Sequence, residues 1–545
     1  MSVSKDREKE IHYRLRMPHG SWGIARTVDV AGLKHPFYRN LGAPKNCADL
    51  PIPLAPRLDL TETQYGLRPW VDDFLTPYQH DGVRRAMAQD ALMLYWPCGV
   101  GKTAASVAIT QAWRAETPMR VITVTKAGTR AQFRREIERL TYQKPMILEG
   151  RNASKIDKRV SWVVTSWEIL PDWIDEILKW NPNIFVADEI HSVKNKGRWS
   201  QVMDRNGKPQ WKLRENRVGA AYRLSRWCHK RLGLTATPIS RNRACLWGQL
   251  DILEPGCWGT FREFAYRYCD GREGTYGGLE AEGKSNSPEL KHRLKRSMHI
   301  VDSGEAAKHL PPLRTQTVYL DASDQCRPLG EAKTKLKQIA KNPMGFREYK
   351  LSEAASRKRK WITSQVEEAW EHGSKVTVFL GRRKVVESMA NQLEKLSLKL
   401  SGEGQPEIPV ITAHGGNTDK QRDEALQRYV SYEGPCVFVG SYQAFGEAYD
   451  GFQCTDLAIQ AMLPTTPRET LQARGRFRRL GGNSTGCLIL YPVAEGTVDE
   501  HVASILLSRL EDVVDIGGDT DVTRLVESLG LEDAEEELLA SILAS

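Results

Sequence analysis

The sequence predicts an α/β protein with two doubly wound parallel-sheet lobes and a helical insertion between them. The chain has 545 residues, more than a single hydrophobic core usually organises. Two separate series of short apolar runs, rich in β-branched residues, alternate with amphipathic helical segments. Such runs are typical of strands buried on both faces of a parallel sheet, and the segments between them are typical of crossover helices. Each series therefore predicts one lobe.

The first lobe is expected over residues 75–245. Amphipathic segments such as Ala131–Leu140 separate its apolar runs and are expected to be helices. The expected strands are ALMLY (Ala91–Tyr95), VITVT (Val121–Thr125), SWVVTS (Ser161–Ser166), IFVADE (Ile184–Glu189) and RLGLTATP (Arg231–Pro238).

The second lobe is expected over residues 375–515, where the same alternation of apolar runs and helical segments returns. Its expected strands are KVTVFLG (Lys375–Gly381), IPVITAHGG (Ile408–Gly416), PCVFVGS (Pro435–Ser441), TDLAIQ (Thr455–Gln460) and GCLILYP (Gly486–Pro492).

Three further segments complete the division of the chain. Residues 1–74 contain several prolines and no clear periodicity, and we interpret them as an accessory segment. Residues 246–374 are basic and helix-prone, and are expected to form helical protrusions and the entry strand of the second lobe. Residues 516–545 turn acidic at Glu532–Leu543, which predicts a short amphipathic helix that packs on a lobe or docks a protein partner.

The charge balance favours a polyanionic partner. Lys and Arg number 78 against 68 Asp and Glu, a formal charge of +10, which suits nucleic acid. Ten of the basic residues lie between Lys333 and Lys360. This stretch is either a solvated helix face or a surface that binds along the phosphate backbone of a nucleic acid.

The ten cysteines are scattered and contain no CxxC pair, which disfavours a zinc ribbon and predicts reduced thiols. The start of the chain, MSVSKDREKEIHYRLR, lacks the apolar region of a signal peptide. No apolar run reaches the ~20 residues that cross a bilayer. We therefore expect a cytoplasmic protein, or a nuclear one in a eukaryote, without membrane contact.

A phosphate-binding loop is expected at WPCGVGKTAAS, where an expected strand gives way to an expected helix. Glycines let backbone N–H groups turn toward phosphate oxygens, a lysine reaches the β- and γ-phosphates, and a hydroxyl holds Mg²⁺. Trp96 departs from the full GxxxxGK[ST] pattern, which has Gly at this position. The expected nucleotide-binding residues are Gly99, Val100, Gly101, Lys102, Thr103 and Ala104, with Thr103 also a metal ligand.

Two carboxylates follow the buried run IFVA. An acidic residue at the end of a neighbouring strand can bind Mg²⁺, and a second one can orient or deprotonate the attacking water. We therefore assign Asp188 as a metal ligand and Glu189 as the catalytic base.

The segment QARGRFRRLGG supplies positive charge from the second lobe. Arg476 and Arg479 lie three residues apart on one helical face, and we expect them to serve as arginine fingers at the γ-phosphate. Arg474 and Arg478 point elsewhere and are expected to form salt bridges or to contact DNA.

These segments, in this order, resemble superfamily 2 helicases with their RecA-like lobes, and within them the Swi2/Snf2-type DNA translocases. The resemblance covers roughly Leu75 to Ile516. It implies that Gln79 of LTPYQHDGV lies near the adenine, and that Thr165 and Ser166 of VVTSWEIL lie near a DNA backbone.

Other matching segments are LTATPISRN, which resembles the motif that couples hydrolysis to lobe movement, and Leu246–Cys269, which resembles the family's helical protrusion. Lys194-Asn195 after DEIH is typical of Snf-type motors rather than RNA helicases. The stretch Tyr268–Leu290 looks like the annealing-helicase subgroup. Two segments depart from the family pattern: Gln443–Gln453 replaces a GxGxNL run, and Met298–Asp302 replaces an arginine pair.

The resemblance implies an ATP- and Mg²⁺-dependent translocase that acts on duplex or forked DNA, most simply as a monomer. One alternative is a strand-separating helicase acting on DNA or RNA. Another is the motor subunit of a restriction or defence complex, whose nuclease would be another chain. A third is a nucleic-acid-binding scaffold without turnover, which the presence of Lys102, Asp188, Glu189, Arg476 and Arg479 disfavours.

Overall fold

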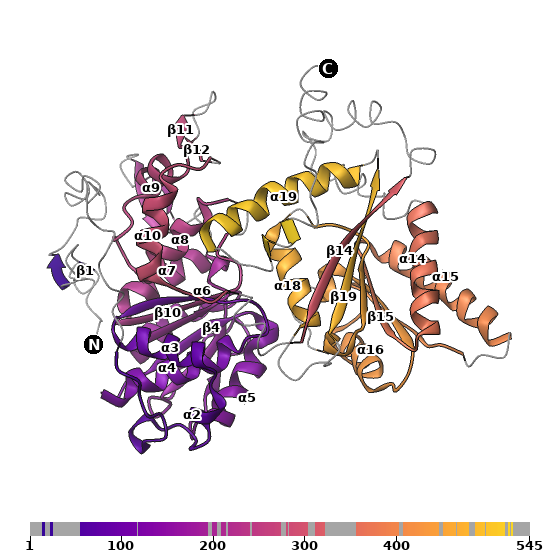
Figure 1. The fold of residues 1–545 in the computed structure, drawn as a ribbon. Helices are drawn as coiled ribbons and strands as arrows, with labels where there is room; N and C mark the ends of the chain where they lie inside the picture. Colours follow the sequence, from indigo (N-terminus) through magenta and orange to yellow (C-terminus); the bar gives the residue numbers. More distant parts are fainter. Residues whose placement is uncertain are drawn as a thin grey trace. The chain divides into compact units, whose positions relative to one another are not determined.

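Two separate parallel sheets organise the chain, which confirms the predicted fold class (Figure 1). The computed structural model describes residues 13–16, 22–25, 55–116, 118–193, 199–203, 209–213, 216–239, 242–273, 279–281, 283–302, 311–321, 356–402, 407–445, 451–464, 466–478, 486–495, 498–517, 522–523 and 525–526. The chain divides into a first unit (Met1–Trp96 and Gly101–Val301) and a second unit (Pro97–Val100 and Asp302–Ser545).

The sheet of the first unit has seven strands, all parallel. Every residue of β3, β4 and β6 is buried, as expected for strands covered on both faces. In order across the sheet, the strands are β13 (Met298–Ile300), β3 (Ala91–Tyr95), β10 (Lys230–Thr235), β7 (Ile184–Asp188), β4 (Val121–Thr125), β6 (Trp162–Ser166) and β5 (Met146–Ile147).

Helices cover both faces of this sheet (Figure 1). In α6, buried residues recur every three or four positions, so one face of the helix packs on the core. One layer contains α3 (Pro77–Met87), α4 (Lys102–Glu116) and α5 (Arg130–Leu140), and the other contains α6 (Leu170–Trp180), α7 (Arg217–Trp227) and α8 (Cys245–Leu253). Shorter elements are η1 (Thr63–Tyr65), α2 (Val71–Phe74), η2 (Ala127–Thr129) and η3 (Ile190–Ser192).

A helical insertion follows β10 and returns to the first sheet. It contains α8, α9 (Phe261–Tyr268), the short hairpin β11 (Arg272–Glu273) and β12 (Leu279–Glu280), and α10 (Ser287–Ser297). Strand β13 then pairs with β3. The sequence did not predict this strand. Two further hairpins are β1 (Tyr13–Arg16) with β2 (Trp22–Ala25), and β8 (Trp199–Met203) with β9 (Pro209–Leu213).

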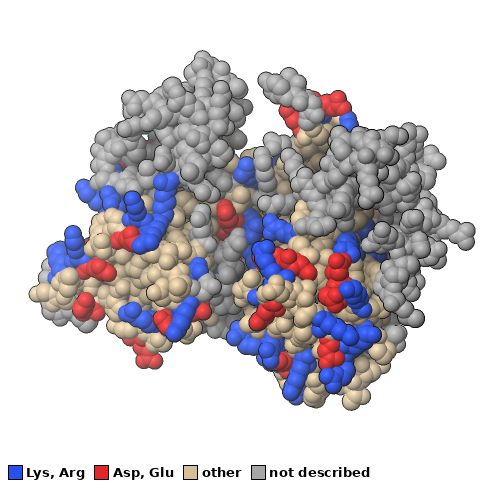
Figure 2. Space-filling view, turned by 180° about the vertical axis from the view of Figure 1, so that it is seen from behind, with Lys and Arg blue, Asp and Glu red and all other residues tan. Residues whose placement is uncertain are grey.

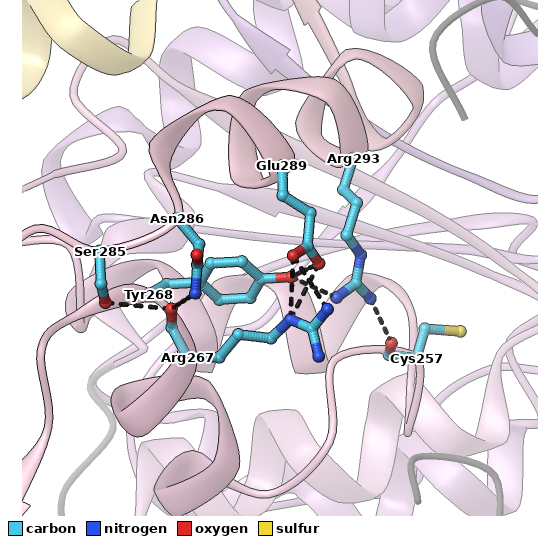
Figure 3. A network of polar contacts seen from close by, with 7 residues as sticks. All are labelled: Cys257, Arg267, Tyr268, Ser285, Asn286, Glu289 and Arg293. Carbon is cyan, nitrogen blue, oxygen red and sulfur yellow. Dashed lines mark hydrogen bonds and ion pairs between the residues drawn. The ribbon is translucent and has the colours of Figure 1, made fainter. Parts of the chain in front are cut away.

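A polar network joins α9 to α10 within the insertion (Figure 3). Arg267 makes a two-pronged ion pair with Glu289, with Nε–Oε1 and Nη2–Oε2 distances of 2.9 Å. The Tyr268 hydroxyl donates to Glu289 Oε1 at 2.7 Å, and Arg293 donates both to that hydroxyl and to the Cys257 carbonyl. Several of these bonds involve a charged group, so they hold the two helices in one arrangement.

The sheet of the second unit has six strands, again all parallel. In order they are β14 (Leu313–Asp321), β19 (Cys487–Glu495), β18 (Leu457–Gln460), β15 (Lys375–Leu380), β17 (Cys436–Ser441) and β16 (Val410–Ala413). The helices are α14 (Ser356–Glu371), α15 (Arg383–Gly402), α16 (Asp419–Ser431), α17 (Tyr442–Phe445), α18 (Pro467–Phe477) and α19 (Val498–Gly517), with η6 (Phe452–Cys454) before β18. Apolar side chains of α14, α15 and the central strands form one core.

The basic stretch Lys333–Lys360 falls mostly outside the described residues. Within it, Lys358 is 1% exposed and its Nζ lies 2.6 Å from Asp499 Oδ2 of α19. For Lys358, both interpretations from the sequence are wrong, because the side chain is buried in an ion pair. On the face drawn in Figure 2, the described Lys and Arg side chains are interspersed with Asp and Glu rather than gathered into one patch.

Within the described part of the chain, the cysteines form no disulfide. No helix in the same part combines the length and the apolar character that a membrane span requires.

Candidate nucleotide-binding site

The expected phosphate loop connects β3 to α4. Two of its residues, Gly99 and Gly101, have φ angles of 81° and 78°, which L side chains rarely adopt. Glycines at these positions let the loop turn its backbone N–H groups inward, as an anion-binding loop requires. The loop ends at the first turn of α4, where the helix dipole also favours an anion.

Gln79 packs directly on this loop. It is the third residue of α3, and its Oε1 accepts from the Thr76 N–H at 2.8 Å in a capping box that starts the helix. Its Nε2 donates to the Gly101 carbonyl at 3.3 Å. A Cβ atom at Gly101 would lie 2.4 Å from that nitrogen and would displace the Gln79 side chain, and the φ of 78° favours glycine there as well. The residue expected near the adenine is thus 2% exposed and joined to the phosphate loop.

Lys102 spans the loop from its far end. Its Nζ donates to the Trp96 carbonyl at 3.0 Å, so the ammonium group lies across the turn that the glycines form. A phosphate oxygen would offer a charged acceptor, which binds an ammonium group more strongly than a carbonyl does. Thr103 is partly exposed beside it, whereas Val100 and Ala104 are buried.

Asp188 is the last residue of β7, and its carboxylate is held by a neighbouring strand. The Thr125 hydroxyl at the end of β4 donates to Asp188 Oδ2 at 2.6 Å. Burial, and then the negative charge of Glu189, raise the pKa of Asp188 to about 7, while Thr125, Lys102 and Lys126 act in the opposite direction. The charge of Lys102 therefore reaches this carboxylate. A bound cation would favour its ionised form.

Glu189 leaves the strand in a left-handed conformation, with φ of 50°. A non-glycine residue there is unusual and is often found at functional sites. Its Oε2 lies 3.1 Å from His191 Nδ1, and the same nitrogen lies 3.1 Å from the Thr235 hydroxyl at the end of β10. Thr235 also accepts from the Thr237 N–H at 3.0 Å. The DEIH segment is therefore connected to the LTATP segment through one buried histidine.

Trp167 is a residue that the sequence analysis missed. Its Nε1 donates to the Asp188 carbonyl at 2.8 Å, and its backbone N–H donates to the Thr125 carbonyl at 2.9 Å. Through its indole and its backbone amide, Trp167 thus bonds to the ends of two strands that carry site residues. By contrast, Thr165 and Ser166 are 0% and 1% exposed, so their side chains are not accessible to a DNA backbone in this structure.

The arginines of the second unit divide into two kinds. Arg474 and Arg478 are buried and donate to Thr315 Oγ1 at 2.8 Å and to the Pro311 carbonyl at 3.0 Å. Of the two roles expected for them, salt bridges or contact with DNA, their burial and these bonds favour contacts within the protein, although Thr315 and the Pro311 carbonyl are neutral groups. Arg476 lies between them near the end of α18 and is partly exposed. Arg479 lies outside the described residues, as do Lys194 and Asn195.

The donor set suits Mg²⁺. Among the described residues, no group of three or more His, Cys, Asp or Glu side chains could hold a metal ion. Mg²⁺ at a phosphate loop needs only one or two protein ligands, because phosphate oxygens and waters supply the rest. The hydroxyl of Thr103 and the carboxylate of Asp188 are oxygen donors of the kind that Mg²⁺ prefers.

Comparisons with known proteins show which family the chain resembles over both units. The SNF2-related domain profile matches residues 78–363, and the helicase conserved C-terminal domain profile matches residues 358–481. A Xenopus laevis protein named "SWI/SNF-related matrix-associated actin-dependent regulator of chromatin subfamily A-like protein 1" is 25% identical over 459 residues, which are 80% of this chain and 43% of that protein.

A Bos taurus protein named "DNA annealing helicase and endonuclease ZRANB3" is 22% identical over 488 residues, 85% of this chain and 42% of that protein. The chain thus spans less than half the length of these two relatives. A solved structure of the ATP-dependent Type ISP restriction-modification enzyme LlaBIII bound to DNA shares the fold, with a TM-score of 0.51 and 12% identity over 81% of this chain and 30% of that one.

Proposed function

Because the chain belongs to the SNF2-related family, we propose that it is an ATP-hydrolysing motor that moves along double-stranded DNA. One observation carries the proposal. Two strands of one sheet, β3 and β7, carry the candidate site at their carboxyl ends. The phosphate loop, with Gln79 bonded to it, follows β3, and the Asp188-Glu189 pair lies at the end of β7. In open parallel sheets, ligands bind at this end of the strands.

Each site residue has a proposed role in hydrolysis. Lys102 moves from the Trp96 carbonyl to the β- and γ-phosphates, and Glu189 orients the attacking water and accepts its proton. Thr103 and Asp188 would hold Mg²⁺, which neutralises part of the phosphate charge when it is bound. Arg476, with Arg479, supplies positive charge as negative charge develops in the transition state.

Coupling to movement is proposed to start at His191. The Nδ1 atom of this residue lies 3.1 Å from both Glu189 Oε2 and the Thr235 hydroxyl, so a change at the carboxylate reaches the end of β10. The two units would then grip the phosphates of one strand alternately. Such a grip does not depend on base sequence and weakens as salt rises.

DNA as the substrate is supported by the names of the relatives. The Bos taurus relative is named a DNA annealing helicase, which favours duplex or forked DNA over RNA for this chain as well. We further propose that the chain acts as a monomer and that Glu532–Leu543, outside the described residues, docks a protein partner. Light scattering and a pull-down with and without this segment would test both points.

The central test is ATPase activity with duplex DNA, single-stranded DNA and RNA as separate activators. We expect duplex or forked DNA to stimulate most, and displacement of a third strand from a triplex to proceed on plain and forked duplexes. Stimulation by RNA alone would reject the proposal in favour of an RNA helicase. The matched variant is Lys102→Ala, for which we expect turnover to be lost by about 10²-fold or more. Unchanged turnover would reject the phosphate-loop assignment.

A further inference from the structure

Trp96 occupies the position at which the common phosphate-loop pattern has glycine, and its side chain is packed and hydrogen-bonded inside the first unit. The indole is fully buried, and its ring lies edge-on to Tyr78 with centroids 5.5 Å apart. A Cβ atom at Gly82 would lie 2.9 Å from the indole, so the ring packs against the backbone of α3. The indole Nε1 donates to His299 Nδ1 at 2.9 Å.

His299 belongs to β13, the strand next to the phosphate-loop strand β3. It is 5% exposed, and its Nε2 lies 3.1 Å from Asp81 Oδ2 in α3. Because Nδ1 accepts from the indole, the ring proton sits on Nε2 and is donated to the carboxylate. That hydrogen bond is the largest cause of the lowered pKa of Asp81. One histidine thus joins Trp96 to the helix that carries Gln79.

The same tryptophan contacts the catalytic lysine through its backbone. Its carbonyl accepts from Lys102 Nζ, while its side chain is held by His299. Strand β13 is the last strand before residue 302, where the chain continues into the second unit. The start of the phosphate loop is therefore fixed by a residue on the segment that leads from one unit to the other.

We propose that His299 is a positioning residue, which holds Trp96 and with it the phosphate loop in the conformation that binds ATP, and which ties that loop to strand β13. The inference rests on the proposed ATPase function. A histidine that only stabilised the core would lower the melting temperature without changing the ATP affinity of the folded protein. The two roles therefore predict different results.

The test compares variants that keep or remove the acceptor of the indole hydrogen bond. His299→Leu and Trp96→Phe each remove the bond, and we expect KM for ATP to rise about fivefold with little change in kcat. His299→Asn places an oxygen where Nδ1 lies and should restore most of the affinity. The double variant Trp96→Phe/His299→Leu should be no worse than either single variant, because both remove the same bond. Additive losses would overturn the inference.

Lys102→Ala, measured in parallel by equilibrium ATP binding, separates this inference from the proposed function. If Lys102→Ala weakens binding but His299→Leu binds ATP as the wild type does, only the inference fails. If neither variant affects binding, the phosphate-loop assignment fails and the inference fails with it. Circular dichroism of each variant establishes the folded fraction to which binding is normalised.

Hydrogen exchange tests the link to β13. The Val301 N–H donates to the Tyr95 carbonyl at 3.2 Å, so its exchange reports on the pairing of β13 with β3. We expect a non-hydrolysable ATP analogue to slow exchange in the peptide covering 298–302 in the wild type but not in His299→Leu. An equal response in both proteins, or none in the wild type, would overturn the link.

Discussion

Two sets of charged residues, one in each unit, differ in what surrounds them. In the first unit, Lys102, Asp188 and Glu189 lie at the carboxyl ends of strands, where the chain can meet a ligand. In the second unit, Arg474 and Arg478 are buried and their described partners are groups of the protein itself. Within the segment QARGRFRRLGG, Arg474 and Arg478 bond to the protein, and we expect the partly exposed Arg476 to act on the ligand. Burial and bonded partners distinguish the two kinds of residue, and the spacing in the sequence does not.

The strongest test of this division compares two arginines two positions apart. Arg476→Ala should lower kcat by about 10³-fold or more while ATP still binds, because an arginine finger acts on the transition state. Arg478→Ala loses its bond to the Pro311 carbonyl and should lower stability while leaving kcat of the folded protein nearly unchanged. Steady-state ATPase with saturating DNA measures both. Equal losses of kcat would mean that the integrity of α18, rather than the charge of Arg476, limits turnover.

Lys358 tests the stabilising role in the second unit. Its ammonium group and Asp499 form a buried pair, so Lys358→Met leaves a carboxylate buried without its cation. We expect the free energy of unfolding, measured with urea, to fall by about 3–5 kcal/mol. Lys358→Met/Asp499→Asn removes the uncompensated charge and should recover most of that loss. If the double variant is as unstable as the single one, the loss arises from packing instead.

The strands that carry the site could be predicted because their apolar runs are continuous and local. ALMLY, VITVT and IFVA each form a buried strand near the expected position, and the helix after Gly101 begins at Lys102. Strand β13 could not be predicted, since three residues carry too little pattern and their pairing with β3 joins positions about 200 residues apart.

The hydrogen-bond partners of the polar side chains also could not be predicted from the sequence. Nothing local indicates that Trp167 supports Asp188 or that Trp96 is bonded to His299, because these contacts arise only when distant segments pack. The left-handed conformation of Glu189 is also set by its tertiary surroundings. Sequence reasoning therefore identified candidate reactive residues, and the structure identified the residues that hold them.

In the first unit, Thr125 tests how Asp188 is supported. Thr125→Val keeps the shape of the side chain but removes the hydroxyl that donates to Asp188 Oδ2. The pKa of Asp188, already raised by burial and by Glu189, should rise further, and the carboxylate should bind Mg²⁺ less well. We expect the Mg²⁺ concentration for half-maximal ATPase to rise about tenfold. Thr129→Val is the matched control: its hydroxyl bonds to Thr125 and to the Lys126 carbonyl, so it reaches Asp188 only through Thr125 and its loss should have a smaller effect. If Thr125→Val needs no more Mg²⁺ than the wild type, the assignment of Asp188 as a metal ligand is wrong.

The smallest effect is expected at the network between α9 and α10, where the first unit uses charge to hold its fold (Figure 3). Burial alone would raise the pKa of Glu289, but hydrogen bonds from Arg267 and Tyr268 outweigh it and lower the pKa below the ordinary 4.5. A lowered pKa means that the ionised form stabilises the folded state, so this stability is present at neutral pH and is lost as pH falls through the folded-state pKa. Glu289→Gln should therefore cost about 1 kcal/mol at pH 7, since the pair is partly exposed, and almost nothing at a pH below the folded-state pKa. Urea unfolding at both pH values measures the difference. If the loss of stability in Glu289→Gln is the same at both pH values, the Glu289 side chain contributes by its shape rather than by its charge. The evidence that charged residues stabilise the fold would then come only from the second unit.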